Sequence, residues 1–297
     1  MVNIVYVILH YLAVKDTLEA IESITLHSVN QRYKIIVVDN GSPDGSGQML
    51  EAKYASDDYV TVLQLANNLG FAKGNNAGIK YAISNFSPKF VVVMNNDVML
   101  LQNEFYARIC KEYQYSGFAV LGPEVETADG RKDSSPVNNA PVTLKAIKKN
   151  YNKERFLYLI ELLHLYNLLE YVQKLKQKRK SKCSKEKRET GRCEDIILHG
   201  CCWIFSEKFF EKYNGLDEST FLYHEEEILY LLTKRFGLKM VYNPAIKVYH
   251  KEDASSNEVM PVGHKKRIFK LRNCLHSSKQ LVRICEENNR YERQIYN

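Results

Sequence analysis

Runs of apolar residues alternate with helical patterns over the first third of the chain. Strands buried on both faces are predicted from four short runs that are rich in β-branched residues, at 3–9, 33–38, 60–65 and 90–94. Helical spacing of the apolar residues between these runs predicts helices over 16–28 and 75–84. Because strands and helices alternate, the sequence predicts a parallel, doubly wound α/β sheet.

Polar side chains follow three of the predicted strands. His10 follows the first, Asp39 follows the second, and the fourth ends in Asn95, Asn96 and Asp97. In open α/β sheets, ligands bind at the carboxyl ends of the strands. Asp97, next to two amides, is placed there to hold a divalent metal ion or a sugar hydroxyl group. The alternative is a turn that uses Asn and Asp for its backbone geometry.

A second group of short elements follows residue 195. Apolar residues over 201–205 predict a strand, and Gly200 before it lets a ligand or another chain segment come close. Three glutamates at 225–227 precede a helical pattern over 228–236, where they sit well at the positive end of the helix dipole. Successive helix residues point about 100° apart, so the three carboxylates cannot all face one site. Two further strands are predicted, separated by a turn at Asn243-Pro244, over 239–242 and 246–249.

The composition fits an enzyme-sized globule. With 297 residues, 45% of them hydrophobic, the chain can bury one large core or two modest ones. We expect no signal peptide, and no stretch approaches the roughly 18 uncharged apolar residues of a transmembrane helix. An odd number of cysteines without a Cys-x-x-Cys pair favours a reduced, cytosolic protein that lacks a structural zinc site. The seven are Cys110, Cys183, Cys193, Cys201, Cys202, Cys274 and Cys285.

The net charge of +7 comes from one segment. Residues 145–192 hold fifteen lysines and arginines against five acidic residues, which leaves the rest of the chain at −3. Within this segment, 156–175 predicts an amphipathic helix with a wide apolar face, and a basic run over 174–182 follows it. This pattern is typical of a helix that lies in the plane of an anionic membrane. The alternative is a helical insertion packed on the domain. Nucleic acid is not an expected partner, because aromatic residues do not interleave with the basic run.

Five elements, in this order, resemble the family 2 nucleotide-sugar glycosyltransferases, whose fold is called GT-A. Residues 39–42 resemble the Asp-x-Ser element of the family, and 67–78 closely match its Asn-x-Gly-Phe-Ala-x-Gly-Asn-Asn segment. Residues 95–97 stand at the Asp-x-Asp position, 221–227 resemble the acidic acceptor-side motif, and His250 stands where many members have a histidine. The resemblance covers most of the chain, and its strength lies in the order of the five elements.

The resemblance implies a GT-A (Rossmann-like) fold with a mostly parallel central sheet flanked by helices. A nucleotide-sugar-binding half is expected over 1–142 and an acceptor-binding half of the same domain over 196–255. The helical basic insertion would occupy 143–195, and a C-terminal helical tail 256–297.

The activity implied is an inverting transfer of a hexose or rhamnose from a UDP- or dTDP-sugar to a hydroxyl group. The acceptor would be a glycan or a lipid-diphosphate-linked sugar in bacterial cell-surface polysaccharide synthesis, at the cytoplasmic face of the membrane. A metal ion, Mg²⁺ or Mn²⁺, would stabilise the departing diphosphate and be held by Asp97 and His250. Since Asn95 replaces the first acidic residue of Asp-x-Asp, His250 and the donor phosphates would have to complete the set of metal ligands.

The resemblance also assigns roles to individual residues. Glu226 is the first choice for the base that takes the acceptor proton, and Glu225 and Glu227 compete with it because the family more often has Glu-Asp there. The donor would be bound by Asp39, Asn68, Lys73, Asn75, Asn96 and Asp97. The acceptor would be bound by Gly200, Trp203 and Arg272. Lys73 and Arg272 have a plainer alternative as solvated helix residues.

Two other function classes remain open on the sequence. A non-catalytic nucleotide-sugar-binding member of the fold would fit the same motifs. A sugar nucleotidyltransferase is less suited, because His10-Tyr11-Leu12 after the first strand makes a poor phosphate cradle.

Overall fold

The computed structural model describes residues 2–29, 31–127, 130, 136–137, 142–166, 191–251 and 263–296. The predicted basic run over 174–182, the second half of the helix predicted over 156–175, and residues 256–262 of the tail lie outside these ranges.

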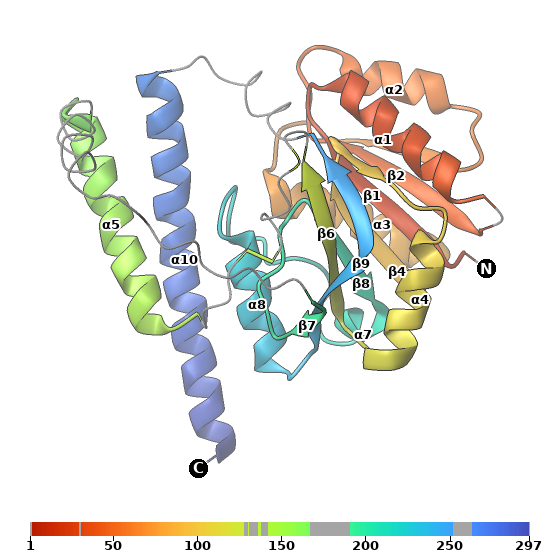
Figure 1. Ribbon diagram of the computed structural model, residues 1–297. Helices are drawn as coiled ribbons and strands as arrows, with labels where there is room; N and C mark the ends of the chain where they lie inside the picture. The colour runs from red at the N-terminus through yellow and green to blue at the C-terminus, as the bar shows by residue number, and fades with distance from the viewer. Residues whose placement is uncertain are drawn as a thin grey trace.

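A single mixed sheet forms the centre of the protein, with strand order β3-β2-β1-β4-β8-β6-β9-β5 (Figure 1). The first four strands of this order are parallel. Antiparallel pairing then joins β8 to β4 and to β6, β5 to β9, and β7 to β9, whereas β6 and β9 are parallel. The strands are β1 (Ile4–His10), β2 (Tyr33–Asp39), β3 (Val60–Gln64), β4 (Phe90–Asn95), β5 (Val98–Leu100), β6 (Val120–Thr127), β7 (Cys193–Glu194), β8 (Cys202–Ser206) and β9 (Met240–His250). The predicted α/β fold is confirmed.

Helices cover both faces of the sheet. Alternate residues of β1 point to opposite faces, so Val5 and Val7 enter one core and Tyr6 and Ile8 the other. The first core includes residues of α3 and α8, and the second includes residues of α1, α2 and α4. The helices are α1 (Val14–His27), α2 (Ser46–Tyr54), α3 (Phe71–Phe86), α4 (Phe105–Ser116), α5 (Leu144–Leu162), α7 (Glu207–Phe210), α8 (Glu225–Arg235) and α10 (His264–Tyr296).

Helix α3 packs unusually close to β1 because it presents two glycines to the strand. A Cβ at Gly74 would stand 2.5 Å from the Leu9 Cδ1 atom, and one at Gly78 would stand 2.4 Å from the Val7 Cγ1 atom. Glycine weakens a helix interior, by roughly 1 kcal/mol relative to alanine. Here it allows the close approach that sets the N-terminus of α3 at the carboxyl edge of the sheet.

Helices α5 and α10 lie side by side at the edge of the protein, and α10 also packs on α8 (Figure 1). Buried Glu161 of α5 accepts hydrogen bonds from His264 at 2.6 Å and from Arg267 at 3.0 Å, both on α10. The insertion is therefore joined to the tail through a paired carboxylate, and the described part of the insertion packs on the protein.

The helix predicted over 156–175 is wrong in its bounds. Helix α5 starts at Leu144 and ends at Leu162. His164 follows in the left-handed region at φ 56°, and the amide of Leu165 donates to the Ile160 carbonyl at 3.0 Å. This is the six-to-one hydrogen bond of a Schellman C-cap, which ends the helix although the apolar pattern continues.

The two strands predicted at 239–242 and 246–249 form one strand, β9. In the ladder with β6, Pro123 pairs with Asn243 and Glu124 with Lys247, so the three residues between them form a bulge. The bulge takes up Pro244, which has no amide hydrogen to give to a ladder. Because the chain continues in the same direction after the bulge, His250 reaches the sheet edge beside the end of β4.

Candidate active site

The carboxyl ends of β1, β2, β4 and β9 bring the predicted donor and metal residues to one edge of the sheet. His10 pairs with Asp39 across β1 and β2, Leu9 pairs with Asn95 across β1 and β4, and Val98 pairs with His250. Asp97 lies between β4 and β5 and is therefore close to His250, although the two residues are far apart in sequence.

Asp97 and His250 form the centre of this edge. The Asp97 Oδ1 and His250 Nε2 atoms are 3.2 Å apart, and both side chains are nearly buried. Two donor atoms that bind one ion at about 2.1 Å in neighbouring octahedral positions are roughly 3 Å apart. The pair therefore fits the two protein ligands of a divalent metal ion, as the sequence predicts.

His199, which the sequence reasoning did not select, lies beside this pair. Its ring centre is 5.7 Å from that of His250, and its Nδ1 atom accepts a hydrogen bond from the Cys201 amide at 3.2 Å. Burial, with the repulsion of nearby His250, lowers the pKa of His199 to about 4. His199 is therefore neutral at physiological pH. Burial raises the pKa of the Cys201 thiol well above its usual value.

Asn96 contacts helix α1. Its amide nitrogen donates to the Ala13 carbonyl at 3.3 Å and to the Thr17 hydroxyl at 3.1 Å. The same hydroxyl lies 2.7 Å from His10 Nδ1, and His10 Nε2 lies 2.9 Å from the Ser46 hydroxyl. Burial lowers the pKa of His10, so a neutral imidazole joins α1 and α2 to the strand edge. These contacts give Asn96 a role in fixing α1 next to Asp97.

Asn40, which the sequence reasoning did not select, organises the loop that precedes α3 together with Asn68. Its side chain donates to Asn68 Oδ1 at 3.1 Å and accepts from the Leu69 amide at 2.9 Å. Gly41, at φ 73°, leaves no room for a Cβ, which would stand 2.5 Å from the carbonyl carbon of Asn67. The two loops are thus locked together. Asn68 takes part in this contact between the loops by accepting the Asn40 hydrogen bond. Gly41, which follows Asp39 and Asn40, was the feature of the sequence that could have indicated such a close contact.

The remaining predicted donor residues lie around these loops. Asp39 is buried and accepts a hydrogen bond from the Ser42 amide at 3.1 Å. Asn75 donates to the Phe71 carbonyl at 3.0 Å, while its Oδ1 atom is buried and has no hydrogen-bond partner among the described residues. Lys73 is exposed in the first turn of α3. Asn75 therefore offers an acceptor that no described residue uses, and Lys73 is an exposed cation two residues before it in the chain.

Asn76 connects α3 to the acidic motif, and the sequence reasoning did not select it. Its side chain accepts from the Leu216 amide at 2.8 Å and donates to Glu218 at 2.9 Å. At the N-terminus of α3, the Phe71 amide donates a hydrogen bond to the Phe221 carbonyl at 2.9 Å. The donor loop and the Gly-Leu-Asp-Glu segment are therefore held as one unit, which carries the chain to the three glutamates.

Glu226 faces Gly200. The Glu226 Oε1 atom accepts a hydrogen bond from the Gly200 amide at 3.2 Å. A Cβ at Gly200 would stand 2.9 Å from the same oxygen, so glycine is the residue that fits. Burial, with the nearby Glu227 charge, raises the pKa of Glu226. Trp203 is fully buried and lies against Gly200, so it supports this turn from the core, and its burial does not favour the predicted contact with an acceptor.

The other two glutamates have different surroundings. Glu225 accepts from the Thr220 hydroxyl at 3.4 Å, and burial together with the Glu226 charge raises its pKa to about 7. Although burial alone would raise the pKa of Glu227, the hydrogen bond at 3.2 Å from His224 lowers it. The helix geometry thus separates the three carboxylates, and Glu226 is the one held against Gly200.

The His224 imidazole lies between two carboxylates, those of Glu154 and Glu227. Its Nε2 atom is 3.2 Å from Glu154 of α5 and 3.1 Å from the Ser278 hydroxyl of α10, and its Nδ1 atom is 3.2 Å from Glu227. Burial would lower the pKa of His224, but the hydrogen bonds to Glu154 and Glu227 raise it to about 10. The imidazole is therefore charged, and it joins α5 and α10 to the start of α8.

Helix α10 makes further contacts with the loop before the glutamates. The Ser277 hydroxyl donates to the Leu222 carbonyl at 2.7 Å, and His276 Nε2 is 3.2 Å from the Ser219 carbonyl. Arg272 is exposed on this helix, and no hydrogen bond or ion pair joins it to the other site residues within the described ranges. The contacts between α10 and the site therefore run through its serines and His276.

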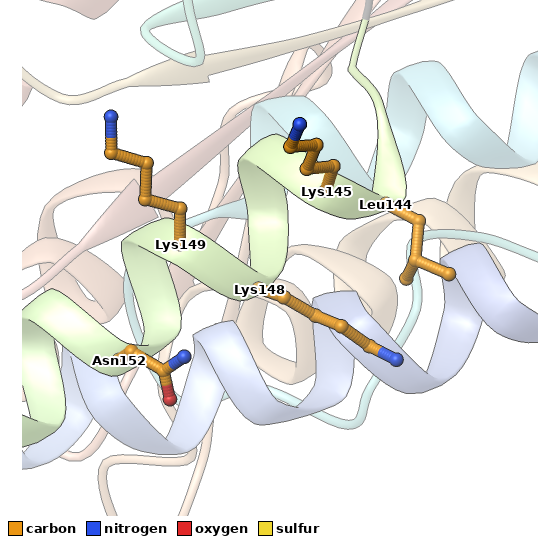
Figure 2. A pocket seen from close by; sticks show the side chains of 5 residues that line it. All are labelled: Leu144, Lys145, Lys148, Lys149 and Asn152. Carbon is orange, nitrogen blue, oxygen red and sulfur yellow. The ribbon is translucent and has the colours of Figure 1, made fainter.

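A hollow on α5 lies apart from this site. It has a volume of about 690 Å³ and is lined by Leu144, Lys145, Lys148, Lys149 and Asn152 (Figure 2). Lys148 extends toward α10, where it pairs with Glu286 at 2.7 Å, whereas Lys145 and Lys149 point away from that helix (Figure 2). The first half of α5 therefore presents a basic surface.

Comparison with known proteins gives a family match over most of the chain. The sequence profile described as "Glycosyl transferase family 2" matches residues 7–213, which include the donor loops and Asp97 and stop before the three glutamates. The low-salt glycan biosynthesis hexosyltransferase Agl10 of Haloferax volcanii is 24% identical over 193 residues, which are 65% of this chain and 50% of that protein. The glycosyltransferase GlyG of Streptococcus pneumoniae is 33% identical over 89 residues, 30% of this chain and 28% of GlyG. The chain thus spans half or less of the length of these curated relatives.

Solved structures share the fold at low sequence identity. The S. aureus TarS 1–349 complex with UDP-GlcNAc has a TM-score of 0.52 at 15% identity, covering 97% of this chain and 72% of that one. GalNAc-T7 with UDP, GalNAc and Mn²⁺ has a TM-score of 0.58 at 12% identity, covering 98% of this chain and 50% of that one.

Proposed function

Because the chain belongs to glycosyl transferase family 2, we propose that it transfers a sugar from a nucleoside diphosphate sugar to a hydroxyl group of a glycan or lipid-linked acceptor. The observation that carries the proposal is the meeting of two groups at one sheet edge. One is the Asp97–His250 pair and the other is Glu226 on the Gly200 amide. A catalytic transferase needs both a cation site for the leaving diphosphate and a base for the acceptor.

Asp97 and His250 are the residues that would hold a divalent ion, Mg²⁺ or Mn²⁺. Such an ion, when bound, neutralises the charge that develops on the departing diphosphate. Support comes from the 3.2 Å separation of the two donor atoms and from the Mn²⁺ in the structure of GalNAc-T7. With Asn95 in place of a second acidic residue, the donor phosphates would supply the further oxygen ligands that the ion needs.

Glu226 would take the proton of the attacking hydroxyl group. Its raised pKa makes it a stronger base than an exposed glutamate, and the Gly200 amide fixes one carboxylate oxygen so that the other can face the acceptor. A single displacement from the face opposite the diphosphate inverts the anomeric configuration. Glu225 is the runner-up, while Glu227 is occupied by His224.

The nucleotide would bind along the edge formed by β1 and β2. Asp39 offers a carboxylate to the base, Asn75 offers its unpaired Oδ1 atom, and Lys73 places a cation near the diphosphate. Uridine and deoxythymidine both present a ring N–H that a carboxylate can accept. UDP and UDP-GlcNAc are bound in structures of TarS, which supports a uridine donor here.

A panel of UDP- and dTDP-sugars tests the activity without an acceptor. We expect slow release of nucleoside diphosphate from at least one donor, dependent on Mn²⁺ or Mg²⁺ and stopped by a chelator, because a transferase leaks some donor to water. Donor binding without any release from the whole panel would instead identify a non-catalytic nucleotide-sugar-binding protein. Formation of a nucleotide sugar from a sugar phosphate and a nucleoside triphosphate would identify a nucleotidyltransferase.

We also propose that α5 contacts an anionic membrane that carries the acceptor. Three apolar side chains, spaced three and four residues apart, are exposed along the second half of α5 and at its C-cap: Phe156 at 53%, Leu159 at 49% and, at the cap, Leu163 at 65%. The lysines of Figure 2 occupy the first half of the same helix. None of the helices in the described ranges is long and apolar enough to cross a bilayer. The contact that we propose is that of a helix lying in the plane of the membrane surface.

Vesicle flotation at low salt measures this contact. The protein is expected to float with vesicles that contain phosphatidylglycerol, and the triple change Phe156→Ser, Leu159→Ser and Leu163→Ser should reduce the floating fraction several-fold. Leu26→Ser is the matched control, because Leu26 is 64% exposed on α1. Equal flotation of the triple variant and the control would exclude α5 as the contact.

A further inference from the structure

Two further metal-binding side chains, those of His199 and Cys201, lie beside the Asp97–His250 pair. One ligand atom from each of His199, Cys201 and His250 can be chosen so that all three lie within 4.8 Å of one another. Two of these residues come from the turn before β8 and the third from the end of β9. Zinc holds nitrogen and sulfur ligands at about 2.0–2.3 Å, so its ligand atoms are roughly 3–4 Å apart. Small side-chain rotations would close the group around one ion.

His250 has a nitrogen atom available for such an ion. Its Nε2 atom is taken by Asp97 at 3.2 Å, whereas its Nδ1 atom is buried and has no hydrogen-bond partner among the described residues. A histidine that binds a metal through one nitrogen commonly donates the other N–H to a carboxylate, which orients the ring. The 3.2 Å separation between His250 Nε2 and Asp97 Oδ1 suits this arrangement.

His199 and Cys201 supply the other two ligands. The lone pair of His199 Nδ1 points at the Cys201 amide, 3.2 Å away, and an ion would replace that amide hydrogen as its partner. The Cys201 thiol would lose its proton to solvent and bind as a thiolate. Because His199 is only partly buried, an ion can enter past it.

We propose that His199, Cys201 and His250 form a zinc site, and that zinc bound there inhibits the enzyme. Two imidazoles and a thiolate favour Zn²⁺ strongly over Mg²⁺, which prefers oxygen ligands. Zinc would draw His250 toward its Nδ1 side and engage Asp97 as the hydrogen-bond partner of the ring. Neither residue would then be free for the catalytic ion. The binding half of this proposal stands on the three ligands alone, whereas the inhibitory half rests on the proposed function.

Cobalt and zinc titrations test the binding half on the purified full chain, without a donor. Co²⁺ is expected to produce a near-ultraviolet sulfur-to-metal charge-transfer band, which Cys201→Ser abolishes and Cys202→Ser retains. Cys202 is the matched control, because it is a buried neighbour outside the group. Calorimetry should show one zinc ion per chain, and Cys201→Ser and His199→Gln should each weaken its binding by about 100-fold or more. Asp97→Asn should keep the band and weaken zinc by roughly 10- to 100-fold, as loss of a carboxylate partner does.

Two results would overturn the site. One is equal zinc affinity in Cys201→Ser and Cys202→Ser, and the other is a charge-transfer band that survives in Cys201→Ser. Thermal unfolding of each variant checks that the fold is retained, and His199→Gln gives the same test at a partly exposed position if Cys201→Ser unfolds.

Nucleotide release in saturating Mn²⁺ tests the inhibitory half. Zinc should inhibit the wild type, and Cys201→Ser should need at least about tenfold more zinc for the same inhibition, in line with its weaker binding. Equal inhibition of both proteins would disprove the inhibitory role and leave the binding site in place. Zinc binding through Cys201 in a protein that releases nucleotide from no donor would disprove the proposed function instead.

Discussion

Replacing Asp97 with alanine is expected to lower metal-dependent nucleotide release by about 100- to 1,000-fold, the loss typical for removing a group that stabilises transition-state charge. Asp97 is the one carboxylate of the Asn95-Asn96-Asp97 triplet, and its partner His250 cannot supply negative charge. The rate is measured with the best donor of the panel at saturating Mn²⁺, and Mn²⁺ affinity is measured separately by its paramagnetic resonance signal.

Asn95→Asp is the matched control for this change. It restores a second acidic residue next to the same site, so we expect Mn²⁺ to bind more tightly and nucleotide release to be retained. Thermal unfolding shows whether Asp97→Ala still folds, since the change leaves His250 Nε2 without its partner. Full nucleotide release by a folded Asp97→Ala protein would remove Asp97 from the metal site.

Replacing Glu226 with glutamine is expected to reduce sugar transfer by roughly 100- to 10,000-fold, the range that general base catalysis contributes. Glutamine keeps the shape of the side chain, and its amide oxygen can still accept the Gly200 amide hydrogen, but it cannot take a proton. Donor affinity should stay unchanged, because the residues that we propose for the nucleotide, Asp39, Asn75 and Lys73, do not include Glu226. Calorimetric titration with the nucleoside diphosphate checks this separation.

The pH profile gives a second reading of the same residue. The pKa of Glu226 is raised above the usual glutamate value, and a base acts only in its ionised form. The wild-type rate should therefore fall as the pH decreases through this raised pKa, and the residual rate of Glu226→Gln should lack that limb. Glu225→Gln is the control. A full loss of transfer in Glu225→Gln, with transfer retained in Glu226→Gln, would assign the base to Glu225.

The order of the acidic motif and the donor loops was visible in the sequence, but the contacts that hold them were not. Asn40 and Asn76 lie within motifs that were recognised, yet their side chains bind segments that are distant in the chain, such as Leu216 for Asn76. Asn68, predicted to bind the donor, also accepts a hydrogen bond from Asn40 within the loop. An asparagine at a strand edge looks the same in the sequence whether it binds a ligand or a loop.

The insertion and the tail show a similar division. Amphipathic spacing predicted a helix in the insertion and the resemblance implied one in the tail, and both regions hold a helix, although α5 has other bounds than predicted. In the structure, His224 contacts Glu154 of the insertion and Ser278 of the tail. These contacts depend on how the helices pack together in the folded protein. Such a contact joins three segments, and the spacing within one segment carries no information about it.

The sequence by itself determined the α/β class, the positions of the four parallel strands and the motifs at their carboxyl ends. Those features are local, because burial imposes a repeat on neighbouring residues and a loop needs particular residues at fixed spacing. Only the tertiary structure decided which polar groups meet. The Asp97–His250 pair exists because β9 continues through its bulge to the edge of β5, and the Glu226–Gly200 contact exists because α8 starts beside the turn before β8. The order of strands in a sheet sets such meetings, and hydrophobic periodicity does not encode that order.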